Sequence, residues 1–132
     1  MNSSGNGKHN RILVVDDEPR ILRFVRLSLG SLGFDVITAS GGEDALKIIS
    51  ADRPELIILD IFMPGMDGFT VLQRLRELEQ IQDIPHIPVI VFSARNSVAE
   101  QAFNLGASDF ISKPFLPEEM AEKVHHAIEH AK

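Results

Sequence analysis

The chain has 132 residues and lacks cysteine, tryptophan and tyrosine altogether. Without cysteine it can form neither disulfide bonds nor thiolate metal sites, and it is compatible with a reducing compartment. Its longest apolar runs, 56–59 and 89–92, are far shorter than the roughly 20 residues that cross a bilayer. Residues 1–10 contain no apolar stretch, so they differ from a signal peptide. We therefore expect a flexible leader over residues 1–10 and a cytoplasmic location without membrane contact.

Positive charge is also scarce in this chain. Its 13 Lys and Arg residues are outnumbered by 19 Asp and Glu residues, which gives a formal net charge of -6 at pH 7. Nucleic-acid backbones bind clustered Lys and Arg, so we expect no direct contact with nucleic acid and instead a protein or small-ligand partner. The length, at about 100 to 200 residues per domain, indicates one domain over residues 11–132.

Short apolar runs alternate with amphipathic stretches along residues 11–132, which is the pattern of a doubly wound α/β fold. The predicted strands are residues 12–15, 36–38, 56–59, 89–92 and 109–112. The predicted helix starts are Pro19, the capping pair Ser40 and Glu43, the cap Asp67, the capping pair Ser97 and Glu100, and Pro117. We expect a flavodoxin-like (βα)5 sandwich whose parallel five-stranded sheet has the order 2-1-3-4-5, because this order sets the first and third strands side by side at the switch point, and the mixed second strand suits an edge.

Charged residues follow three of the predicted strands. Asp16 and Asp17 close the first, Asp60 closes the third, and Lys113 comes after the last. In open parallel sheets the carboxyl ends of the strands meet at one crevice, so these four side chains should share a pocket. Neighbouring carboxylates repel one another unless a cation compensates, and Mg²⁺ is the hard ion that carboxylate and phosphate oxygens suit. With Lys113 to neutralise charge, Asp60 is the best-placed nucleophile for a phosphoryl group.

Simpler interpretations exist for each residue taken alone. Any one of the acids could be a helix cap, and Lys113 could be a surface side chain. The convergence of three acids favours the functional interpretation. His126 and His130, with Glu122 on the same helical stripe, could form a metal clasp, but polar residues are ordinary at a helix C-terminus. Phe103 lies off its helix's apolar stripe, and we expect it to be partly exposed.

Five motifs occur in order along the chain, each at the end of a predicted strand or in a predicted loop. They are Ile12-Leu13-Val14-Val15-Asp16-Asp17-Glu18-Pro19, Asp60-Ile61-Phe62-Met63-Pro64-Gly65-Met66-Asp67-Gly68, Ser93-Ala94, Gly106-Ala107 and Lys113-Pro114-Phe115. Together they resemble the response-regulator receiver domain of two-component signalling, of the kind found in chemotaxis response regulators. The resemblance covers nearly all of residues 11–132.

The resemblance implies a phosphorylation site with a metal beside it. Asp60 would be the phosphoacceptor, supplied by a sensor histidine kinase or a histidine phosphotransfer protein. Asp17, Asp60 and the backbone carbonyl of Phe62 would ligate Mg²⁺, for which Mn²⁺ could substitute, and Asp16 would hold the ion mainly through water. The domain would transfer and lose its phosphoryl group by its own chemistry and would not be a turnover enzyme.

The resemblance also implies a switch. Lys113 would pair with the phosphoryl oxygens, Ser93 would move to hydrogen-bond the phosphoryl group, and Phe110 would turn inward into the vacated space. The face formed by the fourth helix, fifth strand and fifth helix would then change and meet a downstream effector or a second, phosphorylated copy. Phe62 and Arg95 occupy positions that influence the lifetime of the acyl phosphate in this family, and we expect them to shield it from water.

Two other interpretations remain. A Mg²⁺-dependent phosphohydrolase that uses Asp60 would want a second carboxylate two residues later, where this chain has Phe62. A receiver-like interaction module that is never phosphorylated would not need the intact set of charged residues. Dinucleotide binding fails because the first turn, 16–19, holds acids where a glycine-rich phosphate cradle is required.

Overall fold

The structure, a computed structural model, describes residues 11–131. The leader expected over residues 1–10 lies outside the described residues, as does Lys132. The strands are β2 (Arg11–Val15), β3 (Asp35–Ala39), β4 (Leu56–Asp60), β5 (Val89–Ser93) and β6 (Asp109–Ser112). The helices are α1 (Pro19–Gly30), α2 (Gly42–Ala51), α3 (Gly68–Gln82), the 3-10 helix η1 (Asn96–Val98), α4 (Ala99–Asn104) and α5 (Pro117–His130).

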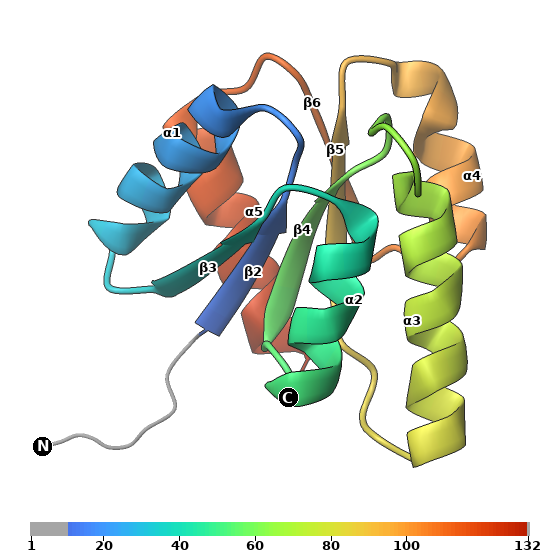
Figure 1. Ribbon diagram of the computed structural model, residues 1–132. Helices are drawn as coiled ribbons and strands as arrows, with labels where there is room; N and C mark the ends of the chain where they lie inside the picture. Colours follow the sequence, from blue (N-terminus) through green and yellow to red (C-terminus); the bar gives the residue numbers. More distant parts are fainter. Residues whose placement is uncertain (1–10, 132) are drawn as a thin grey trace, which may run out of the picture.

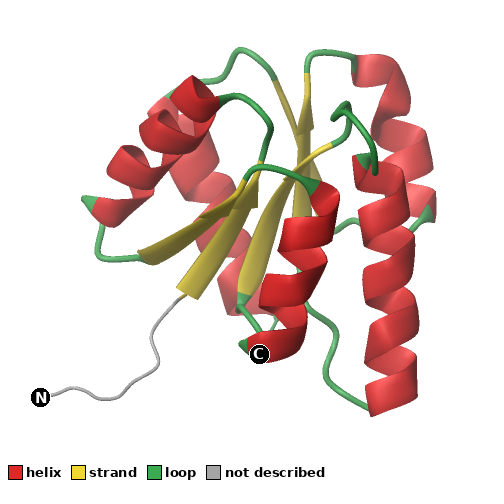
Figure 2. Cartoon of the chain, viewed as in Figure 1, coloured by secondary structure: helices red, strands yellow, loops and turns green. Residues whose placement is uncertain are grey.

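All five strands form one parallel sheet in the order β3-β2-β4-β5-β6. This is the predicted flavodoxin-like order, with the mixed second strand at the edge. Helices α1 and α5 cover one face of the sheet, and α2, α3 and α4 cover the other (Figures 1 and 2). No helix between residues 11 and 131 is long and apolar enough to cross a membrane.

The two faces of the sheet carry separate apolar cores. Along β2, Ile12 and Val14 belong to the core beneath α1 and α5, whereas Leu13 and Val15 belong to the core beneath α2, α3 and α4. Successive side chains of a strand point to opposite faces, so a strand that is covered on both sides must be apolar throughout. This explains why β4 and β5 are buried at every position.

The predicted helix starts are confirmed at three places and wrong at two. Pro19 and Pro117 begin α1 and α5, and the Asp67 carboxylate accepts a hydrogen bond from the Thr70 N–H at 2.9 Å, which caps α3. The two capping boxes do not form. Ser40 precedes the N-cap of α2, which is Gly41, and Ser97 lies inside η1.

The first turn of α2 has no side-chain cap and packs closely against α3. A Cβ built on Gly42 would lie 2.8 Å from the Val71 side chain on α3, so the first turn of α2 packs directly against its neighbour. Real Cβ atoms essentially never lie this close to a neighbour, so a larger residue at position 42 would force the Val71 or Met66 side chain to shift. The sequence spacing of Ser40 and Glu43 carries no information about that contact.

Gly68 brings the first turn of α3 against the end of β4. Its N–H donates to the Ile61 carbonyl oxygen at 2.8 Å. A Cβ at this position would lie 2.8 Å from Ile61 Cα and closer still to the Asp60 carbonyl oxygen, both of which are main-chain atoms that cannot move aside. The backbone of Asp60 is therefore positioned by a contact that only glycine permits.

We expect Gly68→Ala to lower the free energy of unfolding by about 1 to 3 kcal/mol, the usual cost of overpacking. Urea denaturation followed by circular dichroism would measure it. Gly30→Ala is the matched control, because a Cβ there meets nothing within 4 Å, and it should be neutral or slightly stabilising. Equal stabilities of the two variants would contradict the steric role of Gly68.

Candidate functional site

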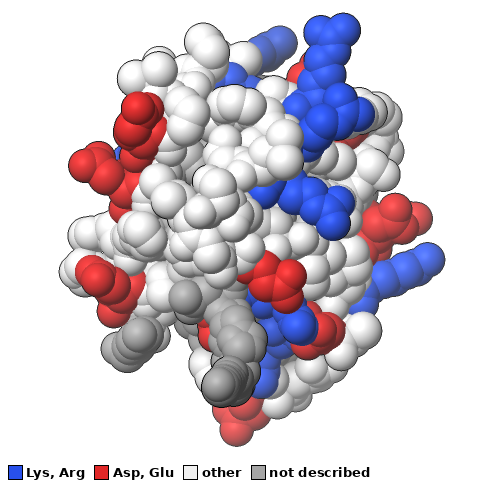
Figure 3. Space-filling view, turned by 90° about the vertical axis from the view of Figure 1, so that its left-hand side faces the viewer, with Lys and Arg blue, Asp and Glu red and all other residues white. Residues whose placement is uncertain are grey.

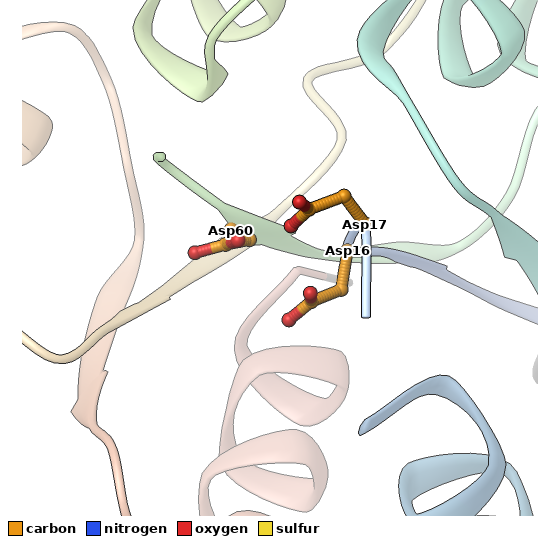
Figure 4. Close-up of side chains that lie close together, drawn as sticks. All are labelled: Asp16, Asp17 and Asp60. Atoms are coloured by element: carbon orange, nitrogen blue, oxygen red, sulfur yellow. The ribbon is translucent and has the colours of Figure 1, made fainter. Parts of the chain in front are cut away.

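Three carboxylates meet at the carboxyl ends of β2 and β4. Asp16 and Asp17 follow β2, and Asp60 ends β4, which lies beside β2 with Val15 opposite Leu59. One oxygen of each carboxylate lies within 4.8 Å of the others, and Figure 4 shows the side chains from the two strand ends in one cluster. Asp16 and Asp60 are buried and Asp17 is exposed. We call Asp16, Asp17 and Asp60 the acidic cluster.

Lys113 supplies the positive charge next to the acidic cluster. Its ammonium nitrogen lies 2.9 Å from Asp16 Oδ2 and 3.4 Å from Asp60 Oδ1. Its backbone N–H donates to the Ser93 carbonyl oxygen at 2.9 Å, and the peptide bond to Pro114 is cis. The sequence prediction that these four charged residues share a pocket agrees with this geometry.

The carboxyl group of Asp60 is short of compensating charge. Burial, together with the negative charges of Asp16 and Asp17, raises the pKa of Asp60 from 3.8 to about 6, although Lys113 acts in the opposite direction. Burial lowers the pKa of Lys113, but its hydrogen bond to Asp16 and the charges of Asp16 and Asp60 outweigh burial, and the net shift is upward. One lysine therefore does not neutralise the acidic cluster.

The donor set of the acidic cluster fits a hard divalent cation. Three carboxylates within 4.8 Å of one another offer oxygen ligands only, which suits Mg²⁺ and excludes metals that need thiolate or imidazole. The raised pKa of Asp60 points the same way, because a bound cation would stabilise the carboxylate against both burial, the larger cause, and repulsion from Asp16 and Asp17. The cluster opens to the outside through a pocket, so an ion could keep some of its waters.

The rim of this pocket is largely apolar and aromatic. Its non-acidic lining residues are Ile21, Phe24, Phe62, Ala94, Lys113, Pro114 and Phe115. Phe62 is 46% exposed, and the Arg95 guanidinium lies over its ring at 4.8 Å from the ring centre. The pocket thus combines a charged floor with an apolar edge, an arrangement that suits a charged group carried on a protein surface.

The two predicted switch residues, Ser93 and Phe110, lie outside the acidic cluster. Ser93 ends β5 and is fully buried, and its hydroxyl oxygen accepts a hydrogen bond from the Arg95 N–H at 3.2 Å. Phe110 lies on the adjacent strand β6, is half-buried, and packs against the core beneath α4. The structure therefore places these two predicted switch residues on neighbouring strands, with Phe110 opposite Val91 and Ser93 opposite Ser112.

Two residues at the site were missed in the sequence. The Glu18 N–H donates to Asp16 Oδ1 at 2.9 Å and so orients that carboxylate. Phe92 lies beneath Lys113, whose ammonium nitrogen is 4.5 Å from the ring centre. Glu18 belongs to the motif of residues 12–19, so its position beside the acidic cluster could have been predicted. Phe92 gave none, because every residue of β5 is apolar or small and the face it occupies cannot be read from periodicity.

Two further expectations from the sequence concern a metal site at His126 and His130 and the exposure of Phe103. His126 and His130 stack with ring centres 4.0 Å apart, but between residues 11 and 131 the acidic cluster is the one group of three or more ligating side chains close enough to hold an ion. The predicted exposure of Phe103 is confirmed at 47%.

Comparisons with known proteins identify the family. The model of the response regulator receiver domain matches residues 12–125. The probable transcriptional regulator ycf27 of Cyanophora paradoxa is 40% identical over 116 residues, which are 86% of this chain and 46% of the relative. The alkaline phosphatase synthesis transcriptional regulatory protein PhoP of Bacillus subtilis is 37% identical over 118 residues, 88% of this chain and 47% of PhoP. The chain thus spans about half the length of these relatives.

A solved structure agrees with these matches. The response regulator protein TrrA of Thermotoga maritima, determined in complex with Mg²⁺ and BeF, superposes with a TM-score of 0.78 at 34% identity, covering 89% of this chain and 98% of TrrA. Residues 12–125, which the family model matches, include the acidic cluster and Lys113. The chain belongs to the receiver domains of two-component response regulators.

Proposed function

We propose that this domain is a signalling switch that accepts a phosphoryl group on Asp60 with the help of Mg²⁺. The observation that carries the proposal is the acidic cluster with Lys113 at 2.9 Å and 3.4 Å from two of its carboxylates. A phosphohydrolase is disfavoured, because position 62 offers a phenyl ring where a second acid-base carboxylate would be needed. Mg²⁺ would be held by Asp16, Asp17, Asp60 and the Phe62 carbonyl, and Mn²⁺ could replace it.

The transfer step needs positioning and charge compensation. An Asp60 carboxylate oxygen forms a bond to phosphorus while the bond from phosphorus to the donor nitrogen breaks, and the donor imidazole leaves with its electron pair and takes up a proton. The product is an acyl phosphate on Asp60. Lys113 would pair with the phosphoryl oxygens, and Mg²⁺, when bound, would neutralise their charge.

The switch would start at Ser93. Its hydroxyl group would leave the Arg95 N–H and donate to the phosphoryl group, and Phe110 would move inward from its half-buried position. The surface of α4, β6 and α5 would change as a result and bind a downstream effector or a second phosphorylated copy. Since the curated relatives are named transcriptional regulators, a DNA-binding effector domain is a plausible target of this change.

The phosphodonor would be a protein that reaches the pocket from the α1 side, a sensor histidine kinase or a histidine phosphotransfer protein. The exposed residues of α1 there include Arg20, Arg23 and Arg26 beside the half-exposed Phe24. Figure 3 shows this side of the molecule as a mainly uncharged surface with Lys and Arg side chains in its upper and right-hand parts and with Asp and Glu side chains at its left edge and in its lower part. The exposed arginines of α1 beside Phe24 favour a protein partner that offers an apolar contact with acidic groups next to it.

Asp60→Asn should abolish phosphorylation, because an amide cannot form the acyl phosphate. Incubation with phosphoramidate and Mg²⁺, followed by intact-mass measurement, should add one phosphoryl group to wild type and none to the variant. Asp44→Asn is the control, since Asp44 is an exposed acid in the first turn of α2. Stoichiometric labelling of Asp60→Asn would refute the proposal.

The pKa of Asp60 makes stability depend on pH in a defined direction. A folded-state pKa of about 6 against an ordinary 3.8 means that the native protein binds more protons than the unfolded chain between these values. The free energy of unfolding therefore falls as pH rises from about 4 to about 6. In EDTA, Asp60→Asn should be more stable than wild type by about 1 to 3 kcal/mol near pH 7.5, and about equal near pH 4.

Magnesium provides the control for this prediction. Saturating Mg²⁺ should raise the stability of wild type near pH 7.5, by about 2.7 kcal/mol at a hundredfold excess over Kd, and should raise that of Asp60→Asn less. Urea denaturation at the two pH values measures both effects. A stability difference between wild type and variant that does not change with pH would show that Asp60 is not the titrating group.

Phe62 and Arg95 stack at the pocket rim, and we propose that they keep water from the acyl phosphate. Phe62→Asn should speed phosphate loss several-fold, because a small polar side chain admits water. Pre-phosphorylated protein would be freed of donor and its loss of mass followed over time. Phe103→Asn is the control, as Phe103 is equally exposed, at 47% against 46%, but outside the pocket lining. Unchanged decay in Phe62→Asn would rule out shielding.

A further inference from the structure

Lys113 has an aromatic neighbour in addition to its two carboxylates. Its ammonium nitrogen lies 4.5 Å from the centre of the Phe92 ring, within the roughly 6 Å at which a cation is attracted to a ring face. The Lys113 side chain is 18% exposed and Phe92 is fully buried. Water screens this pair little, so the attraction is stronger than for a surface pair.

The Phe92 ring is fixed in place by its surroundings. In the sheet, Phe92 lies opposite Asp60 on β4 and opposite Ile111 on β6. On the face of the sheet that α1 and α5 cover, the Phe92 ring meets the Phe115 ring edge-on, with ring centres 6.1 Å apart. The ring therefore offers Lys113 a rigid support whose position is tied through the sheet to that of Asp60.

The carboxylates and the aromatic ring that attract Lys113 differ in their other roles. Asp16 and Asp60 attract Lys113, but they also belong to the acidic cluster that fits a divalent cation, and Asp60 would carry the phosphoryl group. Phe92 attracts the ammonium group without offering a ligand atom or a charge. Its attraction is thus independent of how the carboxylates are occupied.

We propose that Phe92 is a positioning residue that holds the Lys113 ammonium group through a cation–π contact, where it meets the phosphoryl group transferred to Asp60. This inference rests on the proposed function of Asp60 and Lys113. Phe92 acts through Lys113 and touches no reacting atom. The contact should therefore change the rate of phosphorylation in proportion to the electron density of the ring face, and not in proportion to ring size.

Replacing Phe92 by phenylalanines with increasing fluorine substitution separates these two effects. Fluorine withdraws electron density from the ring face while it changes ring shape little, so packing is retained and the cation–π attraction weakens step by step. Each variant would be phosphorylated with phosphoramidate and Mg²⁺ over a range of donor concentrations. The maximal rate constant should fall progressively, by about tenfold for the fully fluorinated ring.

The same substitutions at Phe34 provide the control. Phe34 is buried in the same apolar core but contributes nothing to the pocket lining, so its fluorination should leave the rate unchanged. Thermal unfolding of every variant would verify that the fold is kept. A graded loss at position 92 with none at position 34 supports the inference. Equal rates across the position 92 series, with wild type phosphorylated normally, would overturn it and leave the role of Asp60 intact. Failure of wild type to accept phosphate would refute the proposed function and this inference with it.

Discussion

The imbalance of charge at the carboxyl ends of β2 and β4 is the constraint on which the site depends. Three carboxylates share one lysine, and two of the three are buried. Burial and repulsion raise the pKa of Asp60 to about 6, which is a cost to the fold that a simple structural ion pair would not carry. Such a cost is expected where groups are kept for function, because replacing Asp60 by an apolar residue would remove it.

Main-chain geometry holds this unfavourable arrangement together. The parallel register sets Asp16 beside Asp60, the Glu18 N–H fixes the Asp16 carboxylate, and Gly68 lets α3 approach the Asp60 backbone. Lys113 is held in turn by its backbone hydrogen bond to the Ser93 carbonyl oxygen. The carboxylates therefore cannot move apart to lower their mutual repulsion, and a bound cation could lower it instead.

The fold and the four charged residues could be predicted from the sequence because both depend on local order along the chain. Apolar runs mark buried strands, and a charged residue directly after such a run must lie where the carboxyl ends of the strands meet. The start of α2 and the role of Phe92 could not be predicted, because they depend on contacts between distant segments. A side chain at position 42 would collide with Val71 on α3, and Phe92 resembles every other apolar residue of β5.

The two ends of α4 are held differently, and this limits where a switch can act. Arg76 on α3 donates to the Gly106 carbonyl oxygen at 2.6 Å and to the Ile87 carbonyl oxygen at 2.9 Å, and it pairs with the buried Glu79 at 2.7 Å. The C-terminal end of α4 is thereby tied to α3. At the other end, the turn that follows Ser93 leads into η1, whose first residue, Asn96, accepts a hydrogen bond from the Ser112 hydroxyl group on β6. The movement of the Ser93 hydroxyl group proposed above would consequently reach α4 through residues 94–98 and their contact with β6, while Arg76 holds the C-terminal end of α4 against α3.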